Sequence, residues 1–309
     1  DTKIYTHHSQ LESYLSRLVD GTYCNLKHLR LRSQFREGYS KLAALTSMMS
    51  LDITGCSADS NQLSGIKSLT QLSSLSMGFT QLTDEGRTAS IEGKTEFVIG
   101  GAVYLSGLED LTSLNLEWCH ISENALRQLS RLTKLSRLTL SGMGWVSTGC
   151  LQPLQLLEEL TVLDLSSIDL SDECLAPISS LTKLTQLNLA MNPLTCMAMD
   201  AVSVLTQLRS LNLKKTTVGN DGIRCLSSLV RLRRLNLSGT AVDDHGLLFL
   251  TQLGLLSSLD LSDNFMVGWN NLEHLMPFTS LGFLHKLYLQ KTQANPITVR
   301  SEERRVGKE

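Results

Sequence analysis

Leucines recur along this chain in the pattern Leu-x-x-Leu-x-Leu, which is followed by a turn and a short apolar segment about every 24 residues. The pattern is clearest at 208–213, 232–237 and 256–261. Its Leu-x-Leu part has a period of two, which predicts a short strand with both leucines on one face and the residue between them on the other. A fixed repeat of this length is typical of a solenoid, in which each repeat buries its core by stacking on its neighbours.

The middle leucine of each pattern sets the register and predicts eleven strands. Most steps between these leucines are 24 or 25 residues, with exceptions of 22, 28 and 39. We expect neighbouring strands to pair in parallel along the concave side of a curved α/β solenoid, with short helices on its convex side. The middle leucines are Leu29, Leu51, Leu75, Leu114, Leu138, Leu163, Leu187, Leu211, Leu235, Leu259 and Leu287.

The segment after each strand reads as a turn followed by a short helix. Asp243 is a predicted N-cap, because its carboxylate can accept hydrogen bonds from the first free amides of a helix. Leucines then recur at the helical spacing of positions 247, 250 and 253. The corresponding segments of other repeats open with Asp84, Asp172 and Asp221.

A second row of residues supports this register. It lies three positions after the second leucine of each strand and consists of small polar residues or cysteine, which can bond to backbone groups that a tight turn leaves unpaired. Its members are Cys56, Thr80, Cys119, Asn192, Thr216, Thr240, Asn264 and Thr292.

These residues together resemble the leucine-rich repeat superfamily. The consensus Leu-x-x-Leu-x-Leu-x-x-Thr/Cys-x-Val/Ile-x-Asp-x-Gly-Leu is similar to its cysteine-containing, ribonuclease-inhibitor-like group, which is frequent in cytosolic proteins of plants and algae. The resemblance extends from Asn25 to Thr292. It implies the solenoid fold and a surface for binding proteins, but it names no partner.

The departures from the repeat predict the domain organisation. Residues 1–24 form a partial repeat or an irregular segment, and 25–299 form the solenoid. The step of 39 indicates an insertion at about 87–101, which should be a surface loop on a binding face or a loop without function. Residues 300–309 resemble the translation of a sequencing adapter, and we interpret them as not native.

Composition excludes several classes of protein. The chain has 28 basic and 30 acidic residues, so its net charge of -2 argues against general binding to nucleic acid or to a membrane surface. The seven cysteines include no Cys-x-x-Cys pair, which argues against a zinc or redox site and favours a reducing compartment, the cytoplasm or the nucleus. The sequence contains no run of 18 apolar residues, so it predicts no membrane span.

Two aromatic residues are the first candidates for binding. Phe79 and Trp118 occupy the same position in consecutive repeats, two residues after the second leucine, so they should be neighbours at the ends of adjacent strands. Exposed aromatic side chains are typical anchors of protein interfaces. Glu117 lies beside Trp118. The alternative is that the two rings only pack on each other or under the insertion.

Charged and polar residues of the strands supply the remaining candidates. Basic residues on two adjacent strands and on the first strand could meet an acidic partner, although solvation alone would also explain them. The residues between the strand leucines face the same surface, but Asn and Asp are common there in the resembled family. These candidates are Arg30, Arg32, Arg137, Asp164, Asn188, Asn212, Lys214, Lys215, Arg234, Asn236, Asp260 and Tyr288, with Arg209, Arg231 and Arg233 near the rim.

No motif of a catalytic, phosphate-binding or zinc-binding site occurs in the sequence. We therefore expect a monomeric protein-interaction or scaffold module that is not an enzyme and uses no cofactor or metal. It should bind a protein partner through the concave face and the inserted loop. Two alternatives remain open, the substrate-recognition arm of an F-box-type ubiquitin ligase and the sensor domain of a larger signalling protein.

Overall fold

The computed structural model describes nine stretches of the chain. They divide between two compact units, Asp1–Leu160 and Thr161–Glu309, which are considered separately below. The predicted segments 1–24 and 300–309, together with Arg32, Asp84 and most of the insertion, lie outside the described residues. The described stretches are 26–31, 39–56, 62–80, 89–91, 94–96, 102–119, 123–142, 151–268 and 281–293.

The first unit contains five of the predicted strands, paired in parallel in chain order. Their middle leucines stand opposite one another, as Leu51 does to Leu29 and to Leu75. These strands are β1 (His28–Arg30), β2 (Ser50–Asp52), β3 (Ser74–Ser76), β6 (Ser113–Asn115) and β7 (Arg137–Thr139). The helices are η2 (Tyr39–Ala44), η3 (Gln62–Ser68), α2 (Ala102–Leu105), α3 (Glu123–Leu129) and η4 (Gln152–Leu156), where η marks a 3-10 helix.

The second unit contains the other six predicted strands in the same parallel arrangement, so all eleven strand predictions are confirmed. The strands are β8 (Val162–Asp164), β9 (Gln186–Asn188), β10 (Ser210–Asn212), β11 (Arg234–Asn236), β12 (Ser258–Asp260) and β13 (Lys286–Tyr288). The helices are η5 (Asp172–Ser180), η6 (Cys196–Ala198), α4 (Met199–Ser203), α5 (Gly219–Cys225), η7 (Leu226–Ser228) and α6 (Asp244–Leu250).

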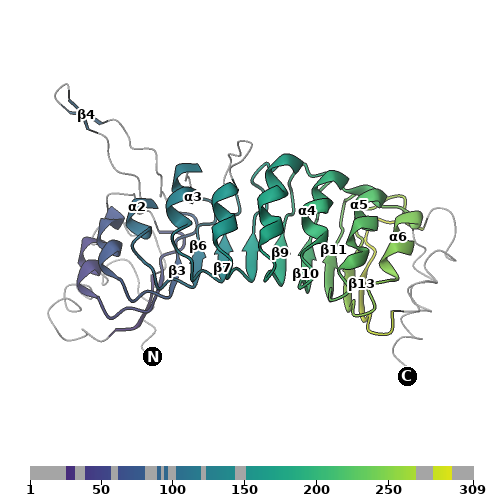
Figure 1. Ribbon diagram of the computed structural model, residues 1–309, viewed down its shortest axis with the longest axis horizontal. Coiled ribbons are helices and arrows are strands. Elements are labelled where there is room, and N and C mark those ends of the chain that lie inside the picture. The colour runs from purple at the N-terminus through teal and green to yellow at the C-terminus, as the bar shows by residue number, and fades with distance from the viewer. Residues whose placement is uncertain are drawn as a thin grey trace. The chain divides into compact units, whose positions relative to one another are not determined.

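The core of each unit lies between its strands and its helices. Outside the last strand, β13, the strand leucines are buried against the helices, as Leu114 and Leu211 are, while the residues beside them are half-buried or exposed. Figure 1 shows the helices of each unit on one side of its strands. The other side, which we call the open face, is formed by the alternating residues of the strands, and it presents most of the predicted binding residues.

The insertion contains a hairpin. Strands β4 (Ala89–Ile91) and β5 (Lys94–Glu96) pair in an antiparallel manner, with Ala89 opposite Glu96. Only Glu92 and Gly93 separate the two strands in the sequence. A two-residue connection that includes glycine favours a hairpin, and this short-range signal was present in the sequence.

The N-cap prediction is confirmed at α6. The carboxylate of Asp243 accepts hydrogen bonds from the backbone N–H groups of His245, at 2.8 Å, and of Gly246, at 3.3 Å. The corresponding aspartates behave differently. Asp172 is the first residue of η5, but its carboxylate accepts a hydrogen bond from the backbone of Thr195, and Asp221 is the third residue of α5. The position of these aspartates in the sequence therefore marks the start of η5 correctly, but it misses the start of α5 by two residues.

We expect the cap at Asp243 to make stability depend on pH. Burial raises the pKa of this carboxyl, but hydrogen bonds from Asn220 and from the two helix amides outweigh burial and lower the pKa below its ordinary value. The cap therefore stabilises the fold above the unfolded-state pKa of about 4 and is lost as pH falls through the lower folded-state value. Asp243→Ala should lower the free energy of unfolding by about 1 kcal/mol at neutral pH.

The measurement is urea unfolding of both proteins between neutral and strongly acidic pH. The difference between wild type and Asp243→Ala should shrink as the solution becomes acidic. A difference that is constant over the whole range would show that the charge of Asp243 contributes nothing.

The small polar row after the strands forms the predicted bonds to the turn backbone. The Thr216 and Thr240 hydroxyls each donate to the carbonyl three residues earlier, at 2.7 Å. The Cys119 thiol donates to the carbonyl of Met77 in the preceding repeat, at 3.3 Å, and burial raises the pKa of this thiol. Cys56 and Cys119 are buried and form no disulfide, as the sequence indicated, and Thr216 and Thr240 are buried as well.

A column of left-handed residues follows the strands, four positions after each middle leucine. Ten such residues have φ values between 54° and 75°, although seven of them are not glycine. The backbone N–H groups of eight of them donate to the turn of the next repeat, as Phe79 donates to Glu117. We call this set the left-handed column: Gly55, Phe79, Trp118 and Gly142 in the first unit, and Ser167, Met191, Lys215, Gly239, Asp263 and Lys291 in the second.

Glycine should therefore be tolerated better in this column than beside it. A left-handed residue with a Cβ atom costs about 1–2 kcal/mol, and Lys215 has a φ of 56°. Lys215→Gly removes that strain, whereas Lys214→Gly adds backbone freedom at an ordinary position. We expect Lys215→Gly to be more stable than Lys214→Gly by about 1–2 kcal/mol in thermal or urea unfolding. Equal stabilities would contradict the assignment of strain to the column.

Candidate functional site

The aromatic pair predicted from the sequence forms at the end of β3 and β6. The ring centroids of Phe79 and Trp118 lie 6.1 Å apart with planes inclined by 22°, so the rings stack on each other. Even so, 54% of Phe79 and 49% of Trp118 remain exposed. The stack therefore does not hide the rings, and both could still contact another molecule.

The pair is supported by glycine on the far side of Trp118. A Cβ atom added at Gly142 would lie 2.3 Å from Cδ2 of the Trp118 ring, which shows that the indole lies directly on this glycine. Gly78 has a similar effect beside Glu117, where an added Cβ would lie 3.3 Å from the Cβ of Glu117. Left-handed backbone at Phe79 and Trp118 projects both rings from the turn, and the missing side chain at Gly142 lets the indole lie flat.

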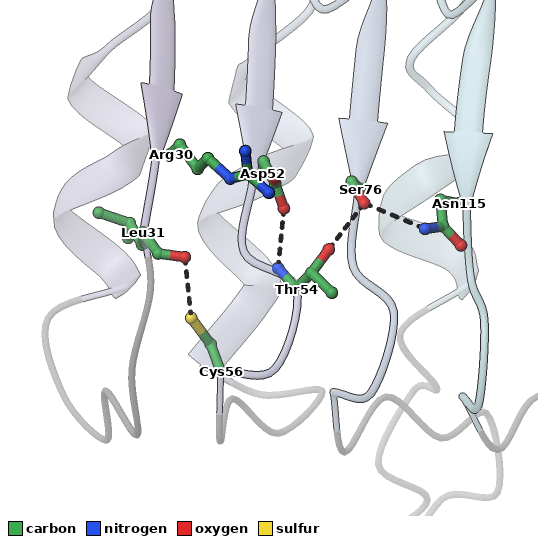
Figure 2. Close-up of polar contacts among 7 residues, drawn as sticks. All are labelled: Arg30, Leu31, Asp52, Thr54, Cys56, Ser76 and Asn115. Atoms are coloured by element: carbon green, nitrogen blue, oxygen red, sulfur yellow. Dashed lines mark hydrogen bonds and ion pairs between the residues drawn. The ribbon is translucent and has the colours of Figure 1, made fainter. Parts of the chain in front are cut away.

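A chain of polar contacts crosses the open face next to the aromatic pair. Figure 2 shows the ion pair between Nε of Arg30 and Oδ2 of Asp52, at 2.8 Å, and the bond from the Thr54 amide to Asp52. The Thr54 and Ser76 hydroxyls are 2.7 Å apart, and Nδ2 of Asn115 donates to Ser76 at 3.2 Å. The contacts thus connect the four adjacent strands β1, β2, β3 and β6.

This chain of contacts changes the interpretation of Arg30. The sequence suggested that Arg30 could meet an acidic partner together with Arg32, which lies outside the described residues. Arg30 instead forms an ion pair with Asp52 from the next repeat, so its charge is balanced within the protein. No ion pair of Glu117 occurs among the described residues, so its half-buried carboxylate is a charge beside the aromatic pair that no described basic residue balances.

The Asn and Asp candidates between the strand leucines have a structural task. The side-chain oxygen of each accepts a hydrogen bond from the backbone N–H two residues later, at 2.9–3.2 Å, and so closes the turn after its strand. The generic explanation of this row is therefore sufficient, although the side chains remain half-exposed. The candidates are Asp164, Asn188, Asn212, Asn236 and Asp260, and Asp52 and Asn115, which were not candidates, make the same bond.

Comparison with known proteins identifies the repeat. The family model "Leucine Rich repeat" matches residues 204–227. An internalin (inlF) from Listeria monocytogenes has 20% identity and a TM-score of 0.66, with 91% of this chain and 78% of the internalin covered. The chain therefore has the fold of leucine-rich repeat proteins, and one of its repeats matches the model of that family.

Two further structures agree with this fold. An internalin C2 from Listeria monocytogenes has 24% identity and a TM-score of 0.54 over 73% of this chain and 84% of its own. A TDR receptor has 16% identity and a TM-score of 0.59 over 91% of this chain and 45% of the receptor. At these identities the likeness concerns the fold alone. A comparison with curated protein sequences found no match. The cysteine-containing subgroup stays a prediction.

The basic candidates fall into two groups. Lys215 lies in the left-handed column near Asp263. A hydrogen bond from Lys291, at 3.0 Å, lowers the pKa of the Asp263 carboxyl, and the charges of Lys214 and Lys215 lower it further. Arg234 is exposed at the start of β11 with no ion pair to a described residue. Arg137 and Tyr288 are exposed on the open faces of the first and second units.

The described residues offer no other kind of site. They contain no group of three or more histidine, cysteine, aspartate or glutamate side chains that could hold a metal ion. Among them, no helix combines the length and the apolar character that crossing a bilayer requires. Asp243 and Asp244, which are adjacent in the sequence, are used for the cap and for a hydrogen bond from the Gly268 amide at 2.6 Å. The absence of catalysis and of a cofactor stays a prediction.

Proposed function

We propose that this leucine-rich repeat protein is an interaction module that binds a protein partner on its open face, with Phe79 and Trp118 as the anchor. The observation that carries the proposal is the exposed, stacked aromatic pair. Aromatic side chains dominate the binding energy of many interfaces because they bury a large area with little loss of conformational freedom.

The surroundings of the pair fit this role. Gly142 holds the indole in one position before binding, which reduces the ordering cost of association. The open face of the first unit next to the rings is lined by hydroxyl and amide groups, including Ser76 and Asn115, which can supply the polar rim of an interface. Glu117 adds a negative charge beside Trp118, so a basic residue of the partner would be favoured at this point.

The experiment has two stages. A photo-cross-linking amino acid at position 79 should attach covalently to a partner, whereas the same amino acid at position 156, on the helical side of the first unit, should not. The affinity of the purified partner is then measured by calorimetry. Phe79→Ala and Trp118→Ala should each weaken binding by about 2 kcal/mol, or roughly thirty-fold.

Leu156→Ala is the matched control, because Leu156 is 56% exposed and lies in η4, one of the helices on the other side of the strands from the open face. Its affinity for the partner should equal that of the wild type. The proposal fails if the aromatic substitutions leave affinity unchanged, or if Leu156→Ala weakens binding to the same extent.

The finer parts of the function are proposals of the same kind. They comprise the use of the insertion by the partner, a monomeric state and a cytoplasmic or nuclear location. No observation on the described residues favours the F-box or the sensor alternative, so both stay predictions. Co-purification of cullin-ligase subunits with the protein would support the first of them.

A further inference from the structure

Four arginines gather at the beginning of β10 and β11 in the second unit. The backbone amides of Arg233 and Arg234 both donate to the carbonyl of Arg209, at 2.9 and 3.0 Å, which places the three residues on adjacent strands. Arg231 lies two residues before Arg233, and its guanidinium donates to the side chain of Gln207 in the preceding repeat. All four are exposed. We call Arg209, Arg231, Arg233 and Arg234 the basic patch.

Arg209 and Arg233 stand where several other repeats have a different kind of residue. Two residues before the middle leucine, five other repeats have a serine or threonine whose hydroxyl donates to the carbonyl at the same position in the preceding repeat, at 2.9–3.0 Å. Arg209 and Arg233 replace this hydroxyl and cannot make its short bond. The residues that follow the rule are Ser73, Thr112, Ser136, Thr185 and Ser257.

Nothing in the described chain balances the charge of the basic patch. The ion pairs among the described residues join Arg30 to Asp52, Lys134 to Asp110 and Lys291 to Asp263, and none includes a member of the patch. Like charges on directly neighbouring strands destabilise a sheet. The arginines therefore weaken the fold slightly at positions where hydroxyl groups would strengthen it, which points to a task outside the fold.

An apolar edge continues the basic patch. Arg231 lies four residues before its middle leucine, and the same place in the next two repeats is held by Leu255 and Phe283, which are 39% and 59% exposed. Strands β11, β12 and β13 pair directly, so these positions follow one another along the same edge. The surface thus changes from cationic to apolar over neighbouring strands.

We propose that the basic patch and its apolar edge dock an acidic segment of a partner protein, with carboxylates on the arginines and an apolar side chain on Leu255 and Phe283. Guanidinium groups bind carboxylates through two parallel hydrogen bonds. A nucleic acid fits less well, because its phosphates would gain nothing from the apolar edge. The nearby open face also carries Asp164 and Asp260, which would repel a long polyanion.

The test uses a labelled peptide in which glutamates surround one phenylalanine, with an oligothymidylate of equal charge as competitor. Arg209→Ser with Arg233→Ser restores the hydroxyl rule of the fold, so the double variant should fold with unchanged or higher stability. Its affinity for the peptide should fall at least about ten-fold at low salt, with a shallower salt dependence. Leu255→Ser with Phe283→Ser should also weaken binding.

The matched control is Lys67→Gln with Arg224→Gln, which removes two exposed positive charges from helices η3 and α5. This control should bind the peptide as the wild type does. The proposal is overturned if the arginine variant binds equally well, if the control loses as much affinity, or if the oligothymidylate binds more tightly than the peptide. Phe79→Ala with Trp118→Ala should leave peptide binding unchanged, which separates this surface from the aromatic anchor.

Discussion

Asn192→Ala is expected to lower the free energy of unfolding by about 4 kcal/mol, because four backbone groups lose their partner at once. Oδ1 of Asn192 accepts hydrogen bonds from the amides of Ile168 and Leu170, at 3.1 and 3.0 Å. Nδ2 donates to the carbonyls of Leu165 and Leu189, at 2.8 and 2.9 Å. Only 2% of Asn192 is exposed, so solvent does not reach these groups in the folded protein.

The matched control is Asn188→Ala, in the strand of the same repeat. Asn188 is half-exposed and caps one turn amide, that of Ala190, at 3.2 Å. Its substitution should cost about 1 kcal/mol, because water can replace the lost bonds. Urea unfolding followed by circular dichroism measures both values. If the two variants were equally stable, the turn network around Asn192 would not be a main source of stability.

Gly142→Ala is expected to lower the free energy of unfolding by about 3 kcal/mol and to move the Trp118 ring. The added Cβ would lie 2.3 Å from Cδ2 of the indole, and the φ of 73° at position 142 is itself unfavourable for alanine. The backbone strain contributes about 1 kcal/mol, and the displacement of a packed ring contributes the rest. Partner binding should weaken as well, because the anchor would lose its position.

Gly239→Ala separates the two causes. Gly239 belongs to the same left-handed column, with φ of 66°, but an added Cβ would approach the nearest side-chain atom, Cγ of Lys215, at an ordinary 3.6 Å. This variant should lose only the strain energy of about 1 kcal/mol and should keep partner affinity. Urea unfolding and the titration of the purified partner check both variants. The support of Trp118 by Gly142 would be refuted if the two alanine variants behaved alike.

Sequence reasoning succeeded where the repeat alone specifies the geometry. The period of two at Leu211 and Leu213 requires both leucines on one face, and a constant step places each strand beside the next, which is why β10 pairs with β11 in register. The register of the middle leucines continues across the insertion, from Leu75 to Leu114, and so also predicts that Phe79 lies beside Trp118. The side-chain bonds of Thr216 and Asn192 followed from their fixed place after the strand.

The interpretation of single side chains was less certain. Asp164 and Asn212 were candidates for binding, yet each closes its own turn. A signal for this was present, because Asn and Asp at regular turn positions bond to the backbone two residues later. Arg30 could not be interpreted from its own neighbourhood, since its partner Asp52 is one repeat away and several other acidic residues were equally possible.

The amino-acid sequence predicts the number and register of the strands, the buried leucine faces and the neighbourhood of the aromatic pair. It can do so because these features depend on periodicity, which is a property of residue order. Only the three-dimensional structure reveals the left-handed column, the support of Trp118 by Gly142 and the unbalanced charge of the basic patch. Those features depend on backbone dihedral angles and on distances between atoms in different repeats, and a linear order of residues contains neither.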